Sequence, residues 1–264
     1  MGANERLTGQ VAGAAKEQRG IHAMEVGGRL LRQLADAGQP MSMAALSVAT
    51  DIPMNQVFTY LVSLTRTGLV RRDALTHRYE PGALSLTFGL HALAQTSPLR
   101  ETFQRTLDLA KATKYGVLVA VWDDRGPTVV QYVSPEVPLH TGMHVGAVMS
   151  MAHTSTGRTF AAFMPKGTVE PMLMCDVRKR HGAGSGPTPE ELEHLLAEVR
   201  EKRLSRADGL PIPGVSSLSV PVFNQSGRIV LAITAFDKTG ILDISGDGGP
   251  ARLLTTLAGE LSSL

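Results

Sequence analysis

Apolar side chains repeat with helical spacing along the first part of the chain. From Gly20 to Asp36 they recur three or four positions apart, which predicts a helix with one buried face. A short apolar run, Ala44 to Ala49, predicts a second helix. The segment Asp51-Ile52-Pro53 interrupts it, and Pro53 suits the first turn of a new helix because its missing N–H costs nothing there.

The third helix and the segment after it have a distinctive pattern. Val57, Leu61 and Leu64 recur at helical spacing and mark a buried face. Two short runs then follow, Leu69–Arg72 and Arg78–Glu80, separated by a polar loop. They predict a β-hairpin, or wing, that carries basic residues.

Two amides and a hydroxyl lie near the start of the third helix, away from its buried face. Asn55, Gln56 and Thr59 are placed where a DNA-binding helix presents side chains to the major groove. Amides in that position bond adenine edges. The spacing therefore fits a winged helix-turn-helix, but a small helical hairpin with a β-ribbon fits it equally well.

A further helix rich in apolar residues is expected from Ala83 to Gln95. Its apolar residues lie on more than one face, which suits a linker helix packed against a partner chain or, equally, against the rest of its own chain. After Ser97 the pattern changes to strands and helices in alternation. Strands are expected at 115–122, 128–134, 217–223 and 228–236, and helices at 97–113, 153–163, 188–202 and 251–264.

This pattern predicts an α+β fold of two domains, the second built around an antiparallel sheet. The run from Leu139 to Ala152 is rich in Gly, Met and His and shows no regular period. The polar run from His153 to Arg158 opens a helix. Its N–H groups and hydroxyls suit either an anion or simple helix capping.

Composition excludes several classes of protein. The 264 residues are 43% hydrophobic with a formal charge of +2, typical of a globular protein with no strong overall attraction to nucleic acid. The chain lacks the run of ~18 apolar residues that a membrane span needs. Without an apolar signal core we expect a cytoplasmic protein. Cys175 is the single cysteine, so no intrachain disulfide forms and a redox role is not expected. The basic run 178–181 is interpreted as part of a solvated loop.

Motifs spread along some 240 residues resemble the IclR family of bacterial transcriptional regulators. They are Ile52-Pro53-x-x-x-Val57, Leu61, Leu64, Gly68–Asp73, Arg78-Tyr79-x-x-Gly82, Val145-Gly146, Thr154-x-x-Gly157-Arg158, Val199-Arg200, Gly214-Val215 and Pro221-Val222-Phe223.

The Gly-, Ala- and Gln-rich composition of residues 1–19 predicts a flexible arm, and the resemblance implies a winged helix-turn-helix domain at 20–82, a linker helix at 83–96 and a GAF-like effector domain at 97–264. It also implies a double-stranded palindromic operator, a small-molecule effector, and a homodimer or homotetramer formed through the linker helix and effector domain. No cofactor and no membrane contact are implied.

The recognition helix departs from the family pattern. Relatives often carry a Lys and an Arg where this chain has Met54 and Thr59. Fewer cations predict a shallower dependence of DNA binding on salt. Base contacts would then rest on Asn55, Gln56 and Thr59, with Phe58 on a thymine methyl group or the sugar backbone, and phosphate contacts on Arg71, Arg72, His77 and Arg78.

The effector domain also departs from the family pattern. Leu210 and Ser217 replace a signature Glu and Cys. The resemblance implies a pocket lined by Met143, Met149, Met151, His153, Ser155, Thr156, Ser217, Thr234 and Phe236, with Asp208 nearby. The methionines and Phe236 make it bulkier and more apolar than a keto-acid pocket. We therefore expect a small aromatic or amphipathic organic acid or amide.

Three functions compete at this point. The first is a ligand-responsive repressor or activator, in which the effector changes the placement of paired DNA-binding domains through the linker helix. The second is a hydrolytic enzyme, which is disfavoured because no Gly-x-Ser-x-Gly elbow and no metal-ligand spacing is present, so no catalytic residue is predicted. The third is a ligand-binding protein that has lost DNA binding, suggested by Met54 and Thr59.

Overall fold

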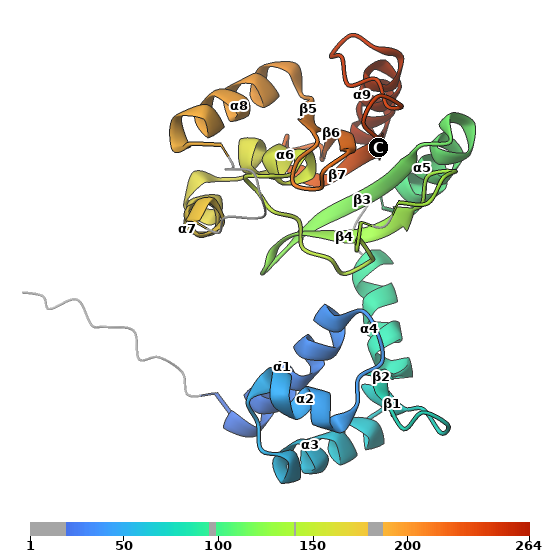
Figure 1. Ribbon diagram of the computed structural model, residues 1–264, viewed down its shortest axis with the longest axis vertical. Helices are drawn as coiled ribbons and strands as arrows, with labels where there is room; N and C mark the ends of the chain where they lie inside the picture. The colour runs from blue at the N-terminus through green and yellow to red at the C-terminus, as the bar shows by residue number, and fades with distance from the viewer. Residues whose placement is uncertain (1–19, 95–98, 140, 179–186) are drawn as a thin grey trace, which may run out of the picture.

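The computed structural model of the chain describes residues 20–94, 99–139, 141–178 and 187–264. It has a small N-terminal domain and a larger C-terminal domain, and helix α4 (Ala83–Ala94) runs between them (Figure 1). The predicted arm at 1–19, the helix start at Ser97-Pro98 and residues 179–181 of the basic run lie outside the described residues. No described helix is long and apolar enough to cross a membrane.

The N-terminal domain packs three helices and a two-stranded ribbon around one core. Its elements are α1 (His22–Ala37), α2 (Met43–Thr50), α3 (Met54–Arg66), β1 (Val70–Arg72) and β2 (Tyr79–Pro81). Leu30, Leu46, Val57 and Leu61 are fully buried in that core. The break at Asp51–Pro53 turns the chain between α2 and α3, as the sequence predicts.

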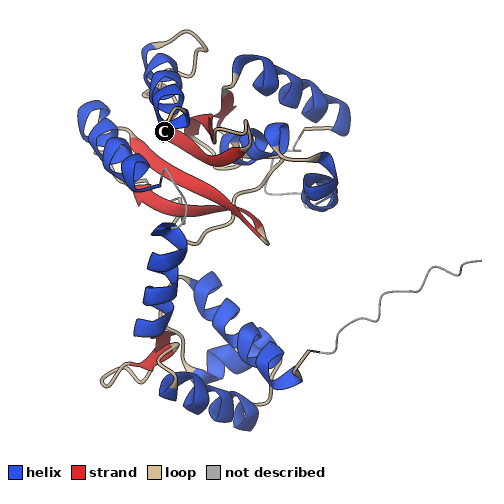
Figure 2. Cartoon of the chain, turned by 180° about the vertical axis from the view of Figure 1, so that it is seen from behind, coloured by secondary structure: helices blue, strands red, loops and turns tan. Residues whose placement is uncertain are grey.

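The C-terminal domain is a five-stranded antiparallel sheet with helices on both faces (Figures 1 and 2). The strand order is β4-β3-β7-β6-β5. Its elements are α5 (Leu99–Thr113), β3 (Gly116–Asp123), β4 (Gly126–Val133), α6 (Ser155–Phe163), α7 (Lys166–Arg178), α8 (Pro189–Lys202), β5 (Ser205–Asp208), β6 (Val215–Phe223), β7 (Ile229–Lys238) and α9 (Gly249–Ser262).

Alternation along the strands separates two apolar layers. Val117 and Val119 face one side of β3 and join the core under α5 and α9. Leu118 and Ala120 face the other side, toward Phe160 of α6. Because successive side chains of a strand point to opposite faces, the single strand β3 supplies both cores.

Two elements are absent from the sequence-based prediction. Helix α7 contains Pro171, a residue that usually ends a helix, and strand β5 has only four residues and pairs only with β6. Neither gives a clear periodic signal. The predicted two-domain α+β fold with an antiparallel sheet is otherwise confirmed.

Candidate functional site

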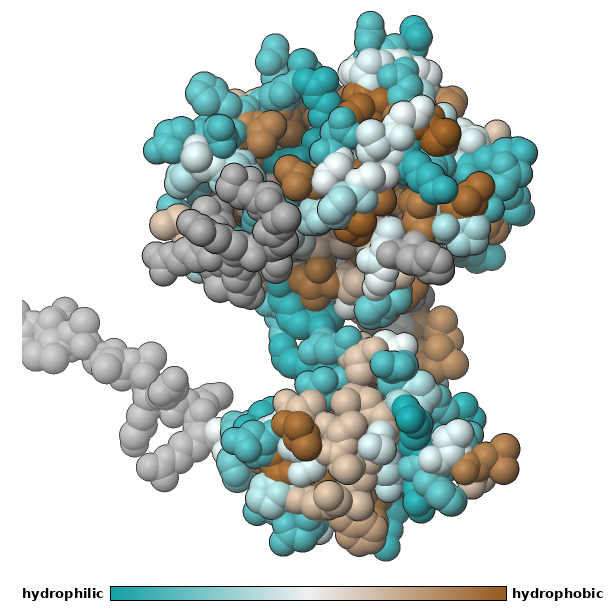
Figure 3. Space-filling model, in the orientation of Figure 1, coloured by the Kyte–Doolittle hydropathy of each residue, from teal (hydrophilic) through white to brown (hydrophobic). Residues whose placement is uncertain are grey.

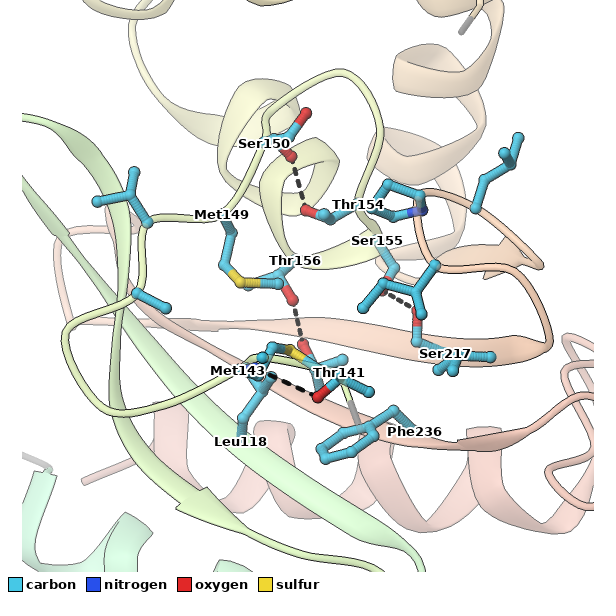
Figure 4. A pocket seen from close by; sticks show the side chains of 18 residues that line it. Leu118, Thr141, Met143, Met149, Ser150, Thr154, Ser155, Thr156, Ser217 and Phe236 are labelled. Atoms are coloured by element: carbon cyan, nitrogen blue, oxygen red, sulfur yellow. Dashed lines mark hydrogen bonds between the residues drawn. The ribbon is translucent and has the colours of Figure 1, made fainter. Parts of the chain in front are cut away.

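A cavity of about 390 Å³ lies in the C-terminal domain, between the sheet and the N-terminal end of α6 (Figure 4). The loop at 141–150 and the segment at 210–212 close its sides. The lining comprises Leu118, Thr141, Gly142, Met143, Ala147, Val148, Met149, Ser150, Thr154, Ser155, Thr156, Leu210, Pro211, Ile212, Val215, Ser217, Thr234 and Phe236.

Helix α6 starts at the cavity with a close-packed cap. The Thr154 side chain accepts a hydrogen bond from the Gly157 N–H at 2.9 Å and donates one to the Ser150 carbonyl at 2.6 Å. A side chain at Gly157 would collide with the backbone of Ser150. Within the described part of the chain, no hydrogen bond engages the N–H groups of Ser155 and Thr156. The positive end of the helix is therefore available to an acceptor atom.

Hydroxyl groups join the start of α6 to the sheet. Ser155 and Ser217 lie 2.7 Å apart, and Thr156 and Thr234 lie 2.8 Å apart (Figure 4). Thr234 in turn donates to Ser219 at 2.9 Å. One end of the cavity thus carries two pairs of hydroxyls beside the helix start. A hydroxyl both donates and accepts, so this end can bind a carboxylate or an amide.

The apolar part of the lining is built around one aromatic ring, that of Phe236, the cross-strand neighbour of Ser217. Phe236 stacks on Tyr132 with ring centroids 5.5 Å apart. It pairs across the sheet with Gly116, where an added Cβ would collide with the Phe236 ring. Gly116 therefore makes room for the ring. Met143 and Met149 complete this apolar part, and methionine side chains adapt readily to the shape of a ligand.

A buried arginine, Arg158, holds the start of helix α6, which borders the cavity, in place. Arg158 of α6 donates to the Ala152 carbonyl at 3.0 Å and to the Arg206 carbonyl on β5 at 2.6 Å. Burial lowers the pKa of Arg158 to about 10, because the charged form loses its hydration. Its guanidinium ties the start of α6 to the edge strand. Among the described residues, no ionisable side chain lines the cavity itself.

Seven of the ten predicted effector residues line this cavity: Met143, Met149, Ser155, Thr156, Ser217, Thr234 and Phe236. Met151 and His153, predicted to line the pocket, are not among its lining residues, and Asp208, predicted to lie nearby, does not line it either. Met151 packs in the apolar cluster with α8, His153 lies 2.9 Å from the Ser150 hydroxyl through Nδ1, and Asp208 accepts from Ser216 at 2.6 Å.

Sequence reasoning missed eleven lining residues: Leu118 on β3, the segment 210–212, and Thr141, Gly142, Ala147, Val148, Ser150, Thr154 and Val215. Leu118 alternates with the core residues Val117 and Val119 on β3, so the period of two could have indicated that it faces a different layer. Nothing in the sequence signals that 210–212 folds over the cavity.

The predicted DNA-contacting residues of α3 are all exposed. Asn55, Gln56, Phe58 and Thr59 lie on its first half. The Asn55 side-chain oxygen accepts from the Gln56 N–H at 3.0 Å, and the Thr59 hydroxyl donates to the Asn55 carbonyl at 3.1 Å. Helix α3 therefore exposes its polar side chains at its N-terminal end. Two of them, Asn55 and Thr59, already form hydrogen bonds with the backbone of the same helix.

The arginine side chains of the wing are exposed, and each also contacts another residue of the N-terminal domain. Arg71 pairs with Glu80 at 2.5 Å, and Arg72 stacks over Tyr79. Arg78 donates to the Pro40 carbonyl at 3.1 Å. Each guanidinium keeps further N–H groups for a phosphate. The predicted phosphate-contacting residues Arg71, Arg72, His77 and Arg78 are thus brought together on one ribbon.

The loop that lines the cavity also contacts the N-terminal domain. His144 lies against Gly38, where an added Cβ would be 2.7 Å from the imidazole ring. Arg32 of α1 pairs with Asp124 at 3.2 Å, and Arg125 pairs with Asp36. Asp124 and Arg125 form the turn between β3 and β4. The cavity and the DNA-binding domain are therefore connected within one chain.

Neither a metal site nor a hydrolytic triad is formed among the described residues. No group of three or more His, Cys, Asp or Glu side chains there could hold a metal ion. Ser150, His153 and Asp176 lie together, but the hydroxyl is in the middle, 2.6 Å from Asp176 and 2.9 Å from His153. In a hydrolytic triad the imidazole is the middle group. The side chain of Cys175 lies outside what the structure describes.

A winged helix-turn-helix joined to a domain with a ligand-sized cavity defines a DNA-binding regulator with an effector domain. Residues 23–74 match the model of the IclR helix-turn-helix domain, and residues 91–245 match that of the bacterial transcriptional regulator IclR C-terminal domain. The chain belongs to the IclR family of bacterial transcriptional regulators, which confirms the predicted resemblance and the prediction that it is not an enzyme.

Individual relatives agree with this assignment. The chain is 25% identical over 217 residues to the "Probable transcriptional regulator SauR" of Cupriavidus necator, covering 78% of this chain and 81% of that protein. The crystal structure of Pseudomonas aeruginosa HmgR is 29% identical, with a TM-score of 0.58 and coverage of 92% and 97%. An IclR homolog from Microbacterium hydrocarbonoxydans, complexed with 4-hydroxybenzoate, is 15% identical, with a TM-score of 0.76 and coverage of 91% and 98%.

Proposed function

We propose that the protein is a cytoplasmic homo-oligomer that binds a palindromic operator and responds to a small aromatic or amphipathic organic acid or amide. The observation that carries the proposal is the cavity beside α6. Its volume of about 390 Å³ lies at the small end of the range of about 300–1,000 Å³ for ligand pockets. It therefore suits a ligand with a single ring.

The polar and apolar parts of the cavity lining match the two parts of such a ligand. A carboxylate or amide oxygen would accept hydrogen bonds from the N–H groups of Ser155 and Thr156, at the positive end of α6. The Ser217 hydroxyl lies beside them. The ring would pack on Phe236 and the methionine side chains. Since no cation lines the described cavity, helix and hydroxyl dipoles would provide all of the anion stabilisation.

The exposed apolar residues of helix α4 support the proposal that the protein forms a homo-oligomer. Leu86, Phe88 and Leu90 are exposed on this helix, where water would otherwise contact three large apolar side chains. A second copy packed along α4 would cover them and pair two recognition helices. Two identical DNA-binding domains related by a two-fold axis require a palindromic site. The charge substitution Phe88→Glu should shift the mass measured by light scattering toward the monomer.

The signal would travel by two routes. The first route is the loop at 141–150, which lines the cavity on one side and contacts the end of α1 through His144 on the other. The second route is α4, which carries any rotation of one domain to the other. A ligand that fits only one position of the loop would thereby favour one placement of the DNA-binding domains.

The decisive experiment is a titration of the protein against the intergenic DNA beside its own gene, with and without aromatic acids. 4-Hydroxybenzoate is the first probe, and benzamide tests the amide alternative. We expect a sequence-specific complex whose affinity changes with one of these compounds. Absence of specific retardation at low salt would contradict the regulator function and favour a protein that binds ligand only. A complex that ignores every compound would contradict the proposed effector class.

A further inference from the structure

The exposed side of the helix-turn-helix carries large apolar side chains. Val48 on α2 is 84% exposed, and Met54 and Phe58 on α3 are 46% and 55% exposed. Ala44, Ala45 and Ala49 are exposed around Val48. In Figure 3 the surface over α2 is correspondingly tan and brown, with hydrophilic side chains beside it. Protein–DNA interfaces are more polar and more positively charged than this surface.

Met54 and Phe58 are placed to act together. They are four residues apart on α3, so their side chains lie next to each other on one face of the helix. Both belong to its N-terminal half, the end that contacts base edges in helix-turn-helix proteins. The buried face of α3 is formed instead by Val57 and Leu61. Packing of the domain therefore does not explain the two large apolar side chains.

The polar neighbours are less available than their residue types suggest. Recognition of adenine by an amide uses its donor and its acceptor together. The Asn55 acceptor already bonds the Gln56 N–H at 3.0 Å, and the Thr59 hydroxyl proton is donated to the Asn55 carbonyl at 3.1 Å. In the described part of the chain no hydrogen bond involves the side chain of Gln56, so its amide stays available for a base, and the other way to discriminate bases here is apolar contact. In the major groove the apolar group on a base edge is the C5-methyl of thymine.

The geometry points to Met54 and Phe58 as readers of thymine methyl groups in each operator half-site. This inference rests on the proposed operator binding. DNA is the partner that the charges favour, because the same domain carries exposed arginines. Arg66 lies at the end of α3, and Arg71 and Arg72 lie on the wing, where they suit phosphates on either side of the groove.

The test replaces single thymines of the bound intergenic DNA with deoxyuridine, which removes the methyl group and keeps every hydrogen-bonding group. We expect one or two positions in each half-site at which the dissociation constant rises roughly fourfold, the value for one buried methyl or methylene group. Deoxyuridine elsewhere in the same DNA should have no effect.

Variants then assign the effect to a residue. Phe58→Ala should bind the thymine DNA more weakly and show no further loss on deoxyuridine at its position, and Met54→Ala should behave likewise at its own position. Leu75→Ala is the matched control, because Leu75 is a 90% exposed apolar residue at the wing tip, and it should retain the full deoxyuridine response. Unchanged thermal unfolding would show that each variant is folded.

The outcomes separate this inference from the function on which it rests. Absence of any specific complex would remove the proposed function and this inference with it. A specific complex that no deoxyuridine weakens, or a Phe58→Ala variant with wild-type DNA affinity, would overturn this inference alone. The apolar surface would then be assigned to a protein partner.

Discussion

Arg125, in the turn between β3 and β4, forms an ion pair with Asp36 near the end of α1, and so joins the effector domain to the DNA-binding domain. The Arg125 side chain is only 24% exposed, and it also pairs with Asp123 at 3.3 Å. This arginine is therefore held from both sides of the domain boundary. Its position beside the loop that lines the cavity makes it a candidate for transmitting the ligand signal.

Reversing the charge of Arg125 should weaken the response to ligand. In Arg125→Glu the new carboxylate would face Asp36 and repel it, which disfavours the observed domain placement. We expect the change in DNA affinity caused by ligand to shrink, while ligand binding measured by calorimetry remains close to wild type. The double variant Arg125→Glu/Asp36→Arg should restore the response.

The matched control for this pair is Lys114→Ala. Lys114 pairs with Glu136 at 2.7 Å within the effector domain, and both side chains are more than half exposed. An exposed pair of this kind contributes about 0–1 kcal/mol. The ligand response should therefore be unchanged in this control. Equal losses of response in the Arg125 and Lys114 variants would contradict a specific role for the contact between domains.

The hydroxyl of Ser217 should contribute directly to ligand affinity. It lies 2.7 Å from the Ser155 hydroxyl at the polar end of the cavity. Ser217→Ala removes one hydrogen-bonding group of the proposed site and should weaken binding of an active acid by about 0.5–1.5 kcal/mol. Calorimetric titration measures this loss. Ser226→Ala, in the exposed turn between β6 and β7, is the control. Full ligand affinity in Ser217→Ala would show that the ligand binds elsewhere.

A single methyl group at Gly116 should reshape the cavity. The Phe236 ring lies where an alanine side chain would be, so Gly116→Ala must displace the ring or the strand. Overpacking of this kind costs about 1–3 kcal/mol of unfolding free energy, which denaturant unfolding measures. The variant Gly116→Ala/Phe236→Leu should recover most of that stability. No destabilisation in Gly116→Ala would contradict the close contact between these two residues.

Arg158 should stabilise the effector domain through its two carbonyl partners. The ammonium group of a lysine is a point charge and lacks the planar fork that reaches Ala152 and Arg206 together. Arg158→Lys should therefore lose one charge-assisted hydrogen bond, worth about 1.5–3 kcal/mol. Urea unfolding of the purified variant gives this difference. Arg228→Lys, on an exposed turn, should be neutral and serves as the control.

The two amides of α3 should differ in their contribution to DNA binding. The acceptor of Asn55 is engaged by the helix, whereas no hydrogen bond in the described part of the chain involves the side chain of Gln56. Gln56→Ala should weaken specific binding by roughly 1–3 kcal/mol if Gln56 contacts a base. Asn55→Ala should have the smaller effect. Anisotropy titrations on specific and non-specific DNA give both values, and the reverse order would contradict this assignment.

The sequence by itself determined most of the elements and their order, with helix α7 and strand β5 as the exceptions. Local rules govern these features: the break at Pro53 separates two helices, and the continuous apolar run within Gly116–Asp123 predicts a strand. Helical and strand periods are properties of neighbouring residues, so they can be read without tertiary structure. The same reasoning placed the polar residues at the start of α6, where Ser155 and Thr156 line the cavity.

Only the tertiary structure decided which side chains share a site. Met149 faces the cavity while Met151, two residues on, packs against α8, because the irregular loop between β4 and α6 has no period to predict its direction. The closure by 210–212 and the contact of His144 with Gly38 join segments far apart in the chain. Such contacts depend on how the sheet and the two domains pack, which no local pattern of residues encodes.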